Sequence, residues 1–156
     1  MSAIPPVPDS VPLPLGAYRA VTHAHGLGFV SGQFPVAEGT LQWPGRVGAE
    51  LTPGEGRDAA ALAAANVLGQ LRRALGADYA RVRLLRIDGF VASAPGFTAQ
   101  ATVLDGASET FVHHLGDRGL HARAAIAVPQ LPRDAAVELV ATFALDDPNP
   151  TKGEHR

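Results

Sequence analysis

Two charged side chains stand out because each lies in an otherwise apolar segment. Glu138 occurs within AAVELVATFAL, and Arg123 begins the preceding apolar stretch, HARAAIAVPQLP. A carboxylate buried without a partner is strongly unfavourable unless it takes up a proton. An arginine presents a planar fork of donors that matches a carboxylate. The two residues therefore predict either a structural ion pair or a site in which Arg123 binds an anion and Glu138 orients water.

The segments that carry these residues are predicted to be strands over 122–128, closed by Pro129, and over 135–145. If the chain doubles back at residues 129–132, Arg123 and Glu138 come to a similar height on adjacent strands. The strand over 135–145 has apolar residues at both its odd-numbered and its even-numbered positions, which point to opposite faces of the sheet. Both faces of this sheet therefore need to be covered.

Upstream, a strand over 27–31 ends at Gly32 and pairs with residues 18–22 as a hairpin. A helix is predicted over 53–75, because Thr52, Pro53 and Glu55 form a capping-box pattern and Gly76 follows its end. Its expected buried face is Ala59, Leu62, Ala63, Asn66, Val67, Gln70, Leu71 and Ala74.

A long strand over 81–94 follows, and then a helix over 103–115 that ends at Gly116. The expected buried stripe of this second helix is Val103, Ala107, Phe111, Val112 and Leu115. The order of elements predicts an α+β fold in which two helices cover one face of a mixed sheet. Another subunit is the natural cover for the other face.

The domain organisation predicted from these patterns is simple. Residues 1–15 form an extended proline-rich arm, residues 16–145 form a single domain, and residues 146–156 form a polar tail. The arm has no basic segment and is interrupted by proline, so it predicts neither a signal peptide nor a membrane-spanning helix. We therefore expect a cytoplasmic protein with no membrane partner.

Composition excludes several classes of function. Charged residues make up 18% of the 156-residue chain, below the roughly 25% usual for a domain, which favours an oligomer. Thirteen Lys and Arg against 15 Asp and Glu give a net charge of -2, which disfavours nucleic acid as a partner. Cysteine is absent, so thiolate and iron–sulfur chemistry are excluded. The six histidines lack a carboxylate at ligand spacing, so no metal is predicted.

Several short sequence blocks follow one another in a fixed order between residues 16 and 145. They are Gly16-Ala17-Tyr18, Phe29-Val30-Ser31-Gly32-Gln33, Ala65-Asn66-Val67-Leu68, Ala122-Arg123, Ala127-Val128-Pro129-Gln130-Leu131-Pro132 and Val137-Glu138. Together these blocks resemble the Rid (reactive intermediate deaminase, YjgF-like) family. The segment over 89–97, together with 105–108, resembles the longer members of that family.

The resemblance implies a chorismate-mutase-like α+β fold and a homotrimer with a ligand cleft at each subunit interface. It also implies hydrolysis of small 2-imino or 2-enamino acids to 2-oxo acids and ammonia, without a cofactor. Arg123 would then hold the substrate carboxylate and Glu138 would orient the attacking water. Tyr18, Ser31 and Gly32 would line the cleft.

Two positions depart from the family pattern. Ala124 stands where the family often has serine, and Asp105 stands on the second helix where it commonly has asparagine, beside the anionic ligand. A non-catalytic trimeric binder or sensor of small carboxylates is therefore the alternative function. Tyr18 could instead pack against the arm, and residues 31–33 could be a turn. A ribonuclease activity is disfavoured, because acidic residues outnumber basic residues in the chain.

Overall fold

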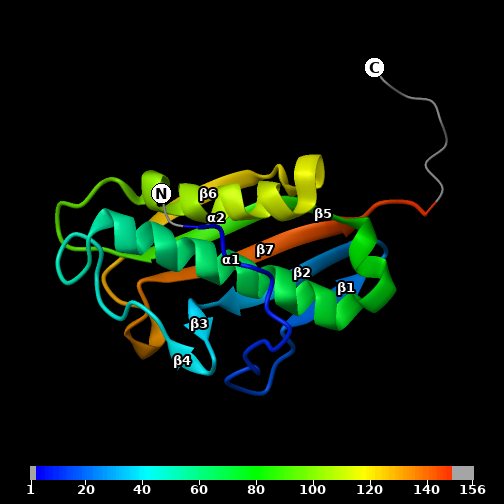
Figure 1. The fold of residues 1–156 in the computed structure, drawn as a ribbon, viewed down its shortest axis with the longest axis horizontal. Helices are drawn as coiled ribbons and strands as arrows, with labels where there is room; N and C mark the ends of the chain where they lie inside the picture. Colours follow the sequence, from blue (N-terminus) through cyan, green and yellow to red (C-terminus); the bar gives the residue numbers. More distant parts are fainter. Residues whose placement is uncertain (1–2, 149–156) are drawn as a thin grey trace.

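The computed structural model describes residues 3–148, and its centre is one five-stranded sheet (Figure 1). Residues 1–2 and 149–156, which belong to the predicted arm and tail, lie outside the described residues. Neighbouring strands are antiparallel except for the parallel pair β5–β6. In spatial order the strands are β1 (Val21–Ala24), β2 (Leu27–Gln33), β7 (Val137–Leu145), β5 (Val82–Ala92) and β6 (Ala122–Val128).

Two helices, α1 (Pro53–Leu75) and α2 (Gln100–Leu115), lie side by side on one face of this sheet (Figure 1). The predicted capping box begins α1, since the Thr52 side chain accepts from the Glu55 N–H while the Glu55 carboxylate accepts from the Thr52 N–H. The Gly76 N–H donates to the Arg72 carbonyl at its other end. The predicted α+β architecture, with two helices on one face of a mixed sheet, is confirmed.

The second helix differs from its prediction at its start and on its surface. It begins at Gln100 rather than at residue 103. This start was not predictable from a capping pattern, because the N-cap residue Ala99 has no side chain that can form a capping hydrogen bond. Val112 is 40% exposed and does not belong to the buried stripe, whereas Val103, Ala107 and Phe111 do.

The first strands also differ from their prediction. The sequence 31–33 is not a turn, because β2 continues through Gln33 with an irregularity in its pairing after Val30. Its partner β1 begins at Val21, so Tyr18 precedes the hairpin. A short hairpin of β3 (Val36–Ala37) and β4 (Thr40–Leu41) was not predicted. Short 3-10 helices connect other elements, namely η1 (Gly76–Arg81), η2 (Gly116–Gly119) and η3 (Pro132–Asp134).

Helix α1 is buried on more sides than one amphipathic face. Val11, in the proline-rich segment before β1, is only 8% exposed and packs at Gly69, where a Cβ atom would overlap the Val11 and Pro8 side chains. This contact buries residues of α1 outside the predicted face. The predicted face is wrong at two positions, because Leu62 is only half-buried and Ala74 is exposed.

The two faces of the sheet are unequally covered. Along β7, Val137, Leu139, Ala141 and Phe143 are buried under the helices, whereas the residues between them are only half-buried. On the opposite face of the sheet, Leu27 and Phe29 of β2 are 41% and 52% exposed. Within residues 3–148, neither helix covers this second face, which we call the open face (Figure 1).

Among the described residues, no helix combines the length and the apolar character needed to cross a membrane.

Candidate active site

Arg123 lies on the edge strand β6, and its side chain turns towards α2. Its Nη1 donates to Asp105 Oδ1 at 3.1 Å and to Ser108 Oγ at 2.9 Å, while Nη2 donates to the Ala101 carbonyl at 3.1 Å. Asp105 and Ser108 are three residues apart, so they occupy the same side of the helix. The side chain of Arg123 is 22% exposed, and that of Asp105 is 47% exposed.

These bonds leave part of the Arg123 guanidinium without an acceptor. An arginine carries five N–H donors, two on each terminal nitrogen and one on Nε. Within residues 3–148, no acceptor reaches the Nε–H or the second N–H of Nη2. Arg123 is therefore held by α2 and still has donors with which to bind a ligand carboxylate.

Glu138 lies on β7, on the open face. Its side chain is half-buried, and none of the described residues forms a hydrogen bond or an ion pair with it. Burial raises the pKa of its carboxyl above the usual value. Gly32 lies directly against this carboxylate, because a Cβ atom there would overlap Glu138 Oε1. The glycine therefore makes the room that the Glu138 side chain occupies.

The prediction that Arg123 and Glu138 lie at a similar height on adjacent strands is wrong for a single chain. Strand β5 lies between β6 and β7, with Ile87 opposite Arg123 and Phe90 opposite Glu138. The two residues also lie on opposite faces, since Arg123 contacts α2 whereas Glu138 alternates with residues buried under the helices. The chain does reverse after β6, but β7 enters the sheet between β2 and β5. The structural ion pair between Arg123 and Glu138 is therefore absent.

Tyr18 and Ser31 lie close to Gly32 and bond to the main chain. The Tyr18 hydroxyl accepts from the Leu15 N–H at 3.2 Å, so the tyrosine does contact the end of the proline-rich segment. The Ser31 hydroxyl donates to the Arg19 carbonyl at 2.7 Å. Tyr18 is 49% exposed, so much of its ring remains available for another contact.

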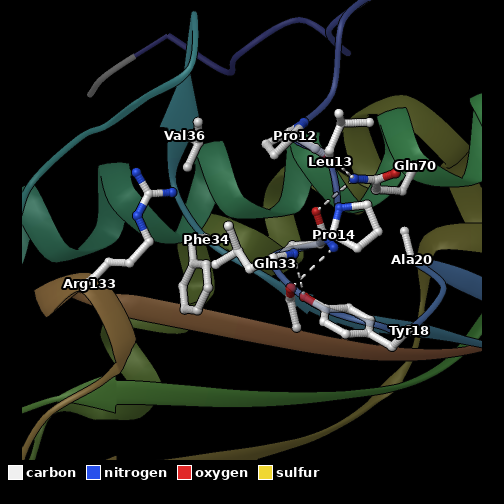
Figure 2. Close-up of a pocket in the computed structure, with 12 residues that line it drawn as sticks. Pro12, Leu13, Pro14, Tyr18, Ala20, Gln33, Phe34, Val36, Gln70 and Arg133 are labelled. Carbon is white, nitrogen blue, oxygen red and sulfur yellow. Dashed lines mark hydrogen bonds between the residues drawn. The ribbon is translucent and has the colours of Figure 1, made fainter.

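A pocket lies between the proline-rich segment, the end of β2 and α1 (Figure 2). In Figure 2, Tyr18 and Arg133 lie on opposite sides of this pocket, and Gln70 reaches towards it from α1. The Gln70 amide donates to the Pro12 carbonyl at 2.7 Å and to Gln33 Oε1 at 3.2 Å. The bond to Pro12 joins the segment over 12–15 to α1, and the bond to Gln33 joins α1 to β2. The segment over 12–15 therefore forms one wall of the pocket.

The predicted site residues thus form two groups in one chain. Tyr18, Ser31, Gly32 and Glu138 lie around the end of β2, whereas Arg123 and Asp105 lie together between β6 and α2. The sequence reasoning missed Ala101 and Ser108 as partners of Arg123, although the three-residue spacing from Asp105 to Ser108 was a signal for the latter. Within residues 3–148, no three His, Asp or Glu side chains gather as a metal ion would require.

A mixed sheet with two helices on one face, as described above, is the chorismate-mutase-like fold. Residues 6–145 match the family described as "YjgF/chorismate mutase-like, putative endoribonuclease". The chain belongs to this family, and the predicted Rid (YjgF-like) membership and fold are confirmed.

The chain is similar in sequence to a curated protein, and in both sequence and fold to solved structures. Protein TCP17 of Trypanosoma cruzi is 42% identical over 120 residues, which are 76% of this chain and 74% of TCP17. The crystal structure of Atu1372, of unknown function, from Agrobacterium tumefaciens is 38% identical over 83% of each chain, with a TM-score of 0.81. A "putative endoribonuclease" from Shewanella oneidensis is 29% identical over 89% of this chain and 91% of its own, with a TM-score of 0.84.

Proposed function

We propose that this protein hydrolyses small 2-imino or 2-enamino acids to 2-oxo acids and ammonia, without a cofactor, in a cleft between subunits of a homotrimer. The observation that carries the proposal is the Glu138 carboxylate, which is half-buried beside Gly32 and has no partner among residues 3–148. A carboxylate kept in that state is suited to bind and activate a water molecule.

The proposed reaction assigns one task to each charged residue. The free donors of Arg123 bind the substrate carboxylate and orient the C=N carbon. The water oxygen bonds to the C=N carbon while Glu138 accepts one water proton and passes it to the nitrogen, which gives a carbinolamine. The hydroxyl proton of the carbinolamine then moves to the nitrogen, the C–N bond breaks, and ammonia leaves. One water is consumed, and the products are a 2-oxo acid and ammonia. The raised pKa of Glu138 makes it a stronger base than an exposed glutamate.

The opposite positions of Arg123 and Glu138 support a cleft that two copies share. Within one chain the two side chains lie on opposite faces with β5 between them, so a small substrate cannot touch both. The open face carries Leu27 and Phe29, and a second copy would bury these apolar side chains. The low charged fraction of the chain supports the same assembly.

A specific observation also favours the alternative of a non-catalytic carboxylate binder. Arg123 already contacts the Asp105 carboxylate, which repels an anionic ligand and competes for the guanidinium. In that case the trimer would bind a small carboxylate through Arg123 without turning it over. The endoribonuclease in the family description is disfavoured, because a net charge of -2 is poorly suited to a polyphosphate backbone.

The shared cleft can be tested by mixing two inactive variants. Arg123→Ala subunits lack the carboxylate anchor, and Glu138→Gln subunits lack the base. When the two are unfolded and refolded together, some interfaces combine an intact Arg123 with an intact Glu138. Random assembly of trimers would restore about a quarter of the wild-type clefts. Deamination of 2-iminobutyrate generated in place is then expected to recover towards that level.

The same experiment contains the results that would contradict the proposal. If the two residues act within one chain, no mixed cleft is complete and the mixture stays inactive. If the wild type binds 2-oxobutyrate but never exceeds the spontaneous rate of imine hydrolysis, the binder function replaces the enzyme. Sedimentation of a folded monomer at micromolar concentration would remove the shared cleft altogether.

A further inference from the structure

Ser108 joins Arg123 to a half-buried histidine. Ser108 Oγ accepts from Arg123 Nη1 at 2.9 Å and lies 3.1 Å from His121 Nε2. The other ring nitrogen of His121, Nδ1, lies 2.6 Å from the Gly119 carbonyl at the end of η2. The His121 ring also packs edge-on against Phe111 of α2, with 5.5 Å between ring centroids. Ser108 on α2, Gly119 on η2, His121 just before β6 and Arg123 on β6 therefore form one continuous chain of hydrogen bonds.

The Gly119 carbonyl at one end of this chain and the Arg123 guanidinium at the other fix the directions of its bonds. A carbonyl can only accept, so His121 Nδ1 must carry a hydrogen. Burial and the nearby Arg123 lower the pKa of His121, so the ring is neutral at pH 7 and its Nε2 is an acceptor. The Ser108 hydroxyl then donates to Nε2. Its oxygen keeps its lone pairs for the N–H of Arg123.

We infer that Ser108 and His121 are positioning residues that fix the guanidinium of Arg123. Neither residue belongs to the predicted site. Asp105 is half-exposed, and the other two acceptors of Arg123 are the Ala101 carbonyl and the Ser108 hydroxyl. The Ser108 bond is the shortest of the three, and the His121 ring holds the serine hydroxyl that accepts it. The consequence for ligand binding rests on the proposed function, since it is Arg123 that would hold the substrate carboxylate.

Other charged groups surround this chain of bonds. Arg123 is the charged group that lowers the pKa of His121, and it is itself paired with Asp105. The remaining charged or titratable residues on the adjacent elements are Glu109, His113 and His114 on α2, Asp117 and Arg118 on η2, and Arg83, Arg86 and Asp88 on β5.

The first experiment needs no ligand. Nitrogen NMR of the wild type at pH 7 is expected to show His121 as the tautomer with hydrogen on Nδ1, the opposite of the one that free histidine prefers. Hydrogen on Nε2 would overturn the inference, because Ser108 could then not donate to that nitrogen.

The second experiment uses a matched pair of variants and the wild-type assembly. The amide of His121→Gln can reach the position of Nε2 and accept from Ser108, whereas His121→Asn can only replace the bond to Gly119. Relaxation of the Arg123 Nε–H signal is expected to show a rigid guanidinium in the wild type and His121→Gln. The same signal is expected to be mobile in His121→Asn and Ser108→Ala, while exposed Arg86 is unchanged in all four.

Binding of 2-oxobutyrate by calorimetry extends the same comparison. Ser108→Ala and His121→Asn are expected to weaken binding about 3-fold to 10-fold, as for the loss of one hydrogen bond, and His121→Gln is expected to restore it. If the wild type does not bind the acid, the proposed function fails, and the mobility of Arg123 still decides the inference. Equal mobility of Arg123 in all four proteins would overturn it.

Discussion

The region around Arg123 and the region around Glu138 are built in opposite ways. Arg123 is a cation with three protein acceptors, supplied by one helix that crosses over its edge strand. Glu138 is an anion with no partner in the described chain, and it lies against a glycine on the open face. One charge is held in place and the other is kept available.

This difference indicates what each region needs. A group that anchors a ligand gains from being fixed before binding, because less freedom is lost when the ligand arrives. A group that accepts a proton gains from poor solvation, because burial raises its pKa.

The largest expected effect comes from removing the anchor. Arg123→Ala is expected to weaken binding of 2-oxobutyrate by about 100-fold or more and to abolish deamination, because charge-assisted hydrogen bonds contribute about 1.5 to 3 kcal/mol each. The fold is expected to survive, since a partly exposed ion pair contributes only about 0 to 1 kcal/mol. Calorimetry and a melting curve measure both, with Arg86→Ala as the control. A variant that unfolds would assign Arg123 a structural role instead.

The next effect separates turnover from binding at the other region. Glu138→Gln keeps the size of the side chain but loses the base, so turnover is expected to fall about 10²-fold to 10⁴-fold. Binding of 2-oxobutyrate is expected to stay the same or improve slightly, because a negative charge is removed from the cleft. Parallel imine assays and calorimetry test this. An equal loss in both would show that Glu138 binds the ligand rather than activating water.

A smaller effect is expected from filling the space beside Glu138. Gly32→Ala places a Cβ atom where the carboxylate lies, so Glu138 must move, and turnover is expected to fall about 10-fold with a stability loss of about 1 to 3 kcal/mol. Gly54→Ala is the control, because a Cβ there meets only Thr52 Oγ1 at 3.9 Å. Unchanged turnover in Gly32→Ala would show that the position of the Glu138 carboxylate does not matter.

Asp105 offers a way to strengthen the anchor. Asp105→Asn keeps an acceptor for Arg123 Nη1 but removes a negative charge close to the proposed ligand carboxylate. Binding of 2-oxobutyrate is expected to tighten by up to about 5-fold, equivalent to about 1 kcal/mol at a partly exposed site. Weaker binding in calorimetry would mean that the charge of Asp105 is needed to hold Arg123.

The smallest effect is on stability and depends on pH. Because the folded protein raises the pKa of Glu138, the protonated carboxyl stabilises the fold at low pH, and this contribution is lost as pH rises through the folded pKa. Glu138→Gln cannot ionise, so it is expected to melt slightly higher than the wild type at pH 7. The difference is expected to vanish well below the ordinary pKa of glutamate, where Glu138 is neutral in both the folded and the unfolded protein. A lower melting temperature for the variant at pH 7 would contradict the burial of this charge.

Much of the local structure was predictable because its signals are local. The capping box and the glycine after α1 placed both ends of that helix, and the limits of β6 agree with the prediction over 122–128. The strand over 135–145 was predicted to have two apolar faces that need to be covered, and the helices cover one of them, at Val137, Leu139, Ala141 and Phe143 of β7. Helix α2 began earlier than predicted, because its first turn contains no capping side chain.

The sequence by itself determined the family, the class of fold and the identity of two unusual charges in apolar strands. Only the tertiary structure decided how those charges are arranged, because strand order depends on long-range packing that no local pattern records. The insertion of β7 between β2 and β5 put Glu138 beside Gly32 and separated it from Arg123. The contacts of Arg123 with Ser108 and Asp105 likewise arise only because α2 packs over the strand that follows it.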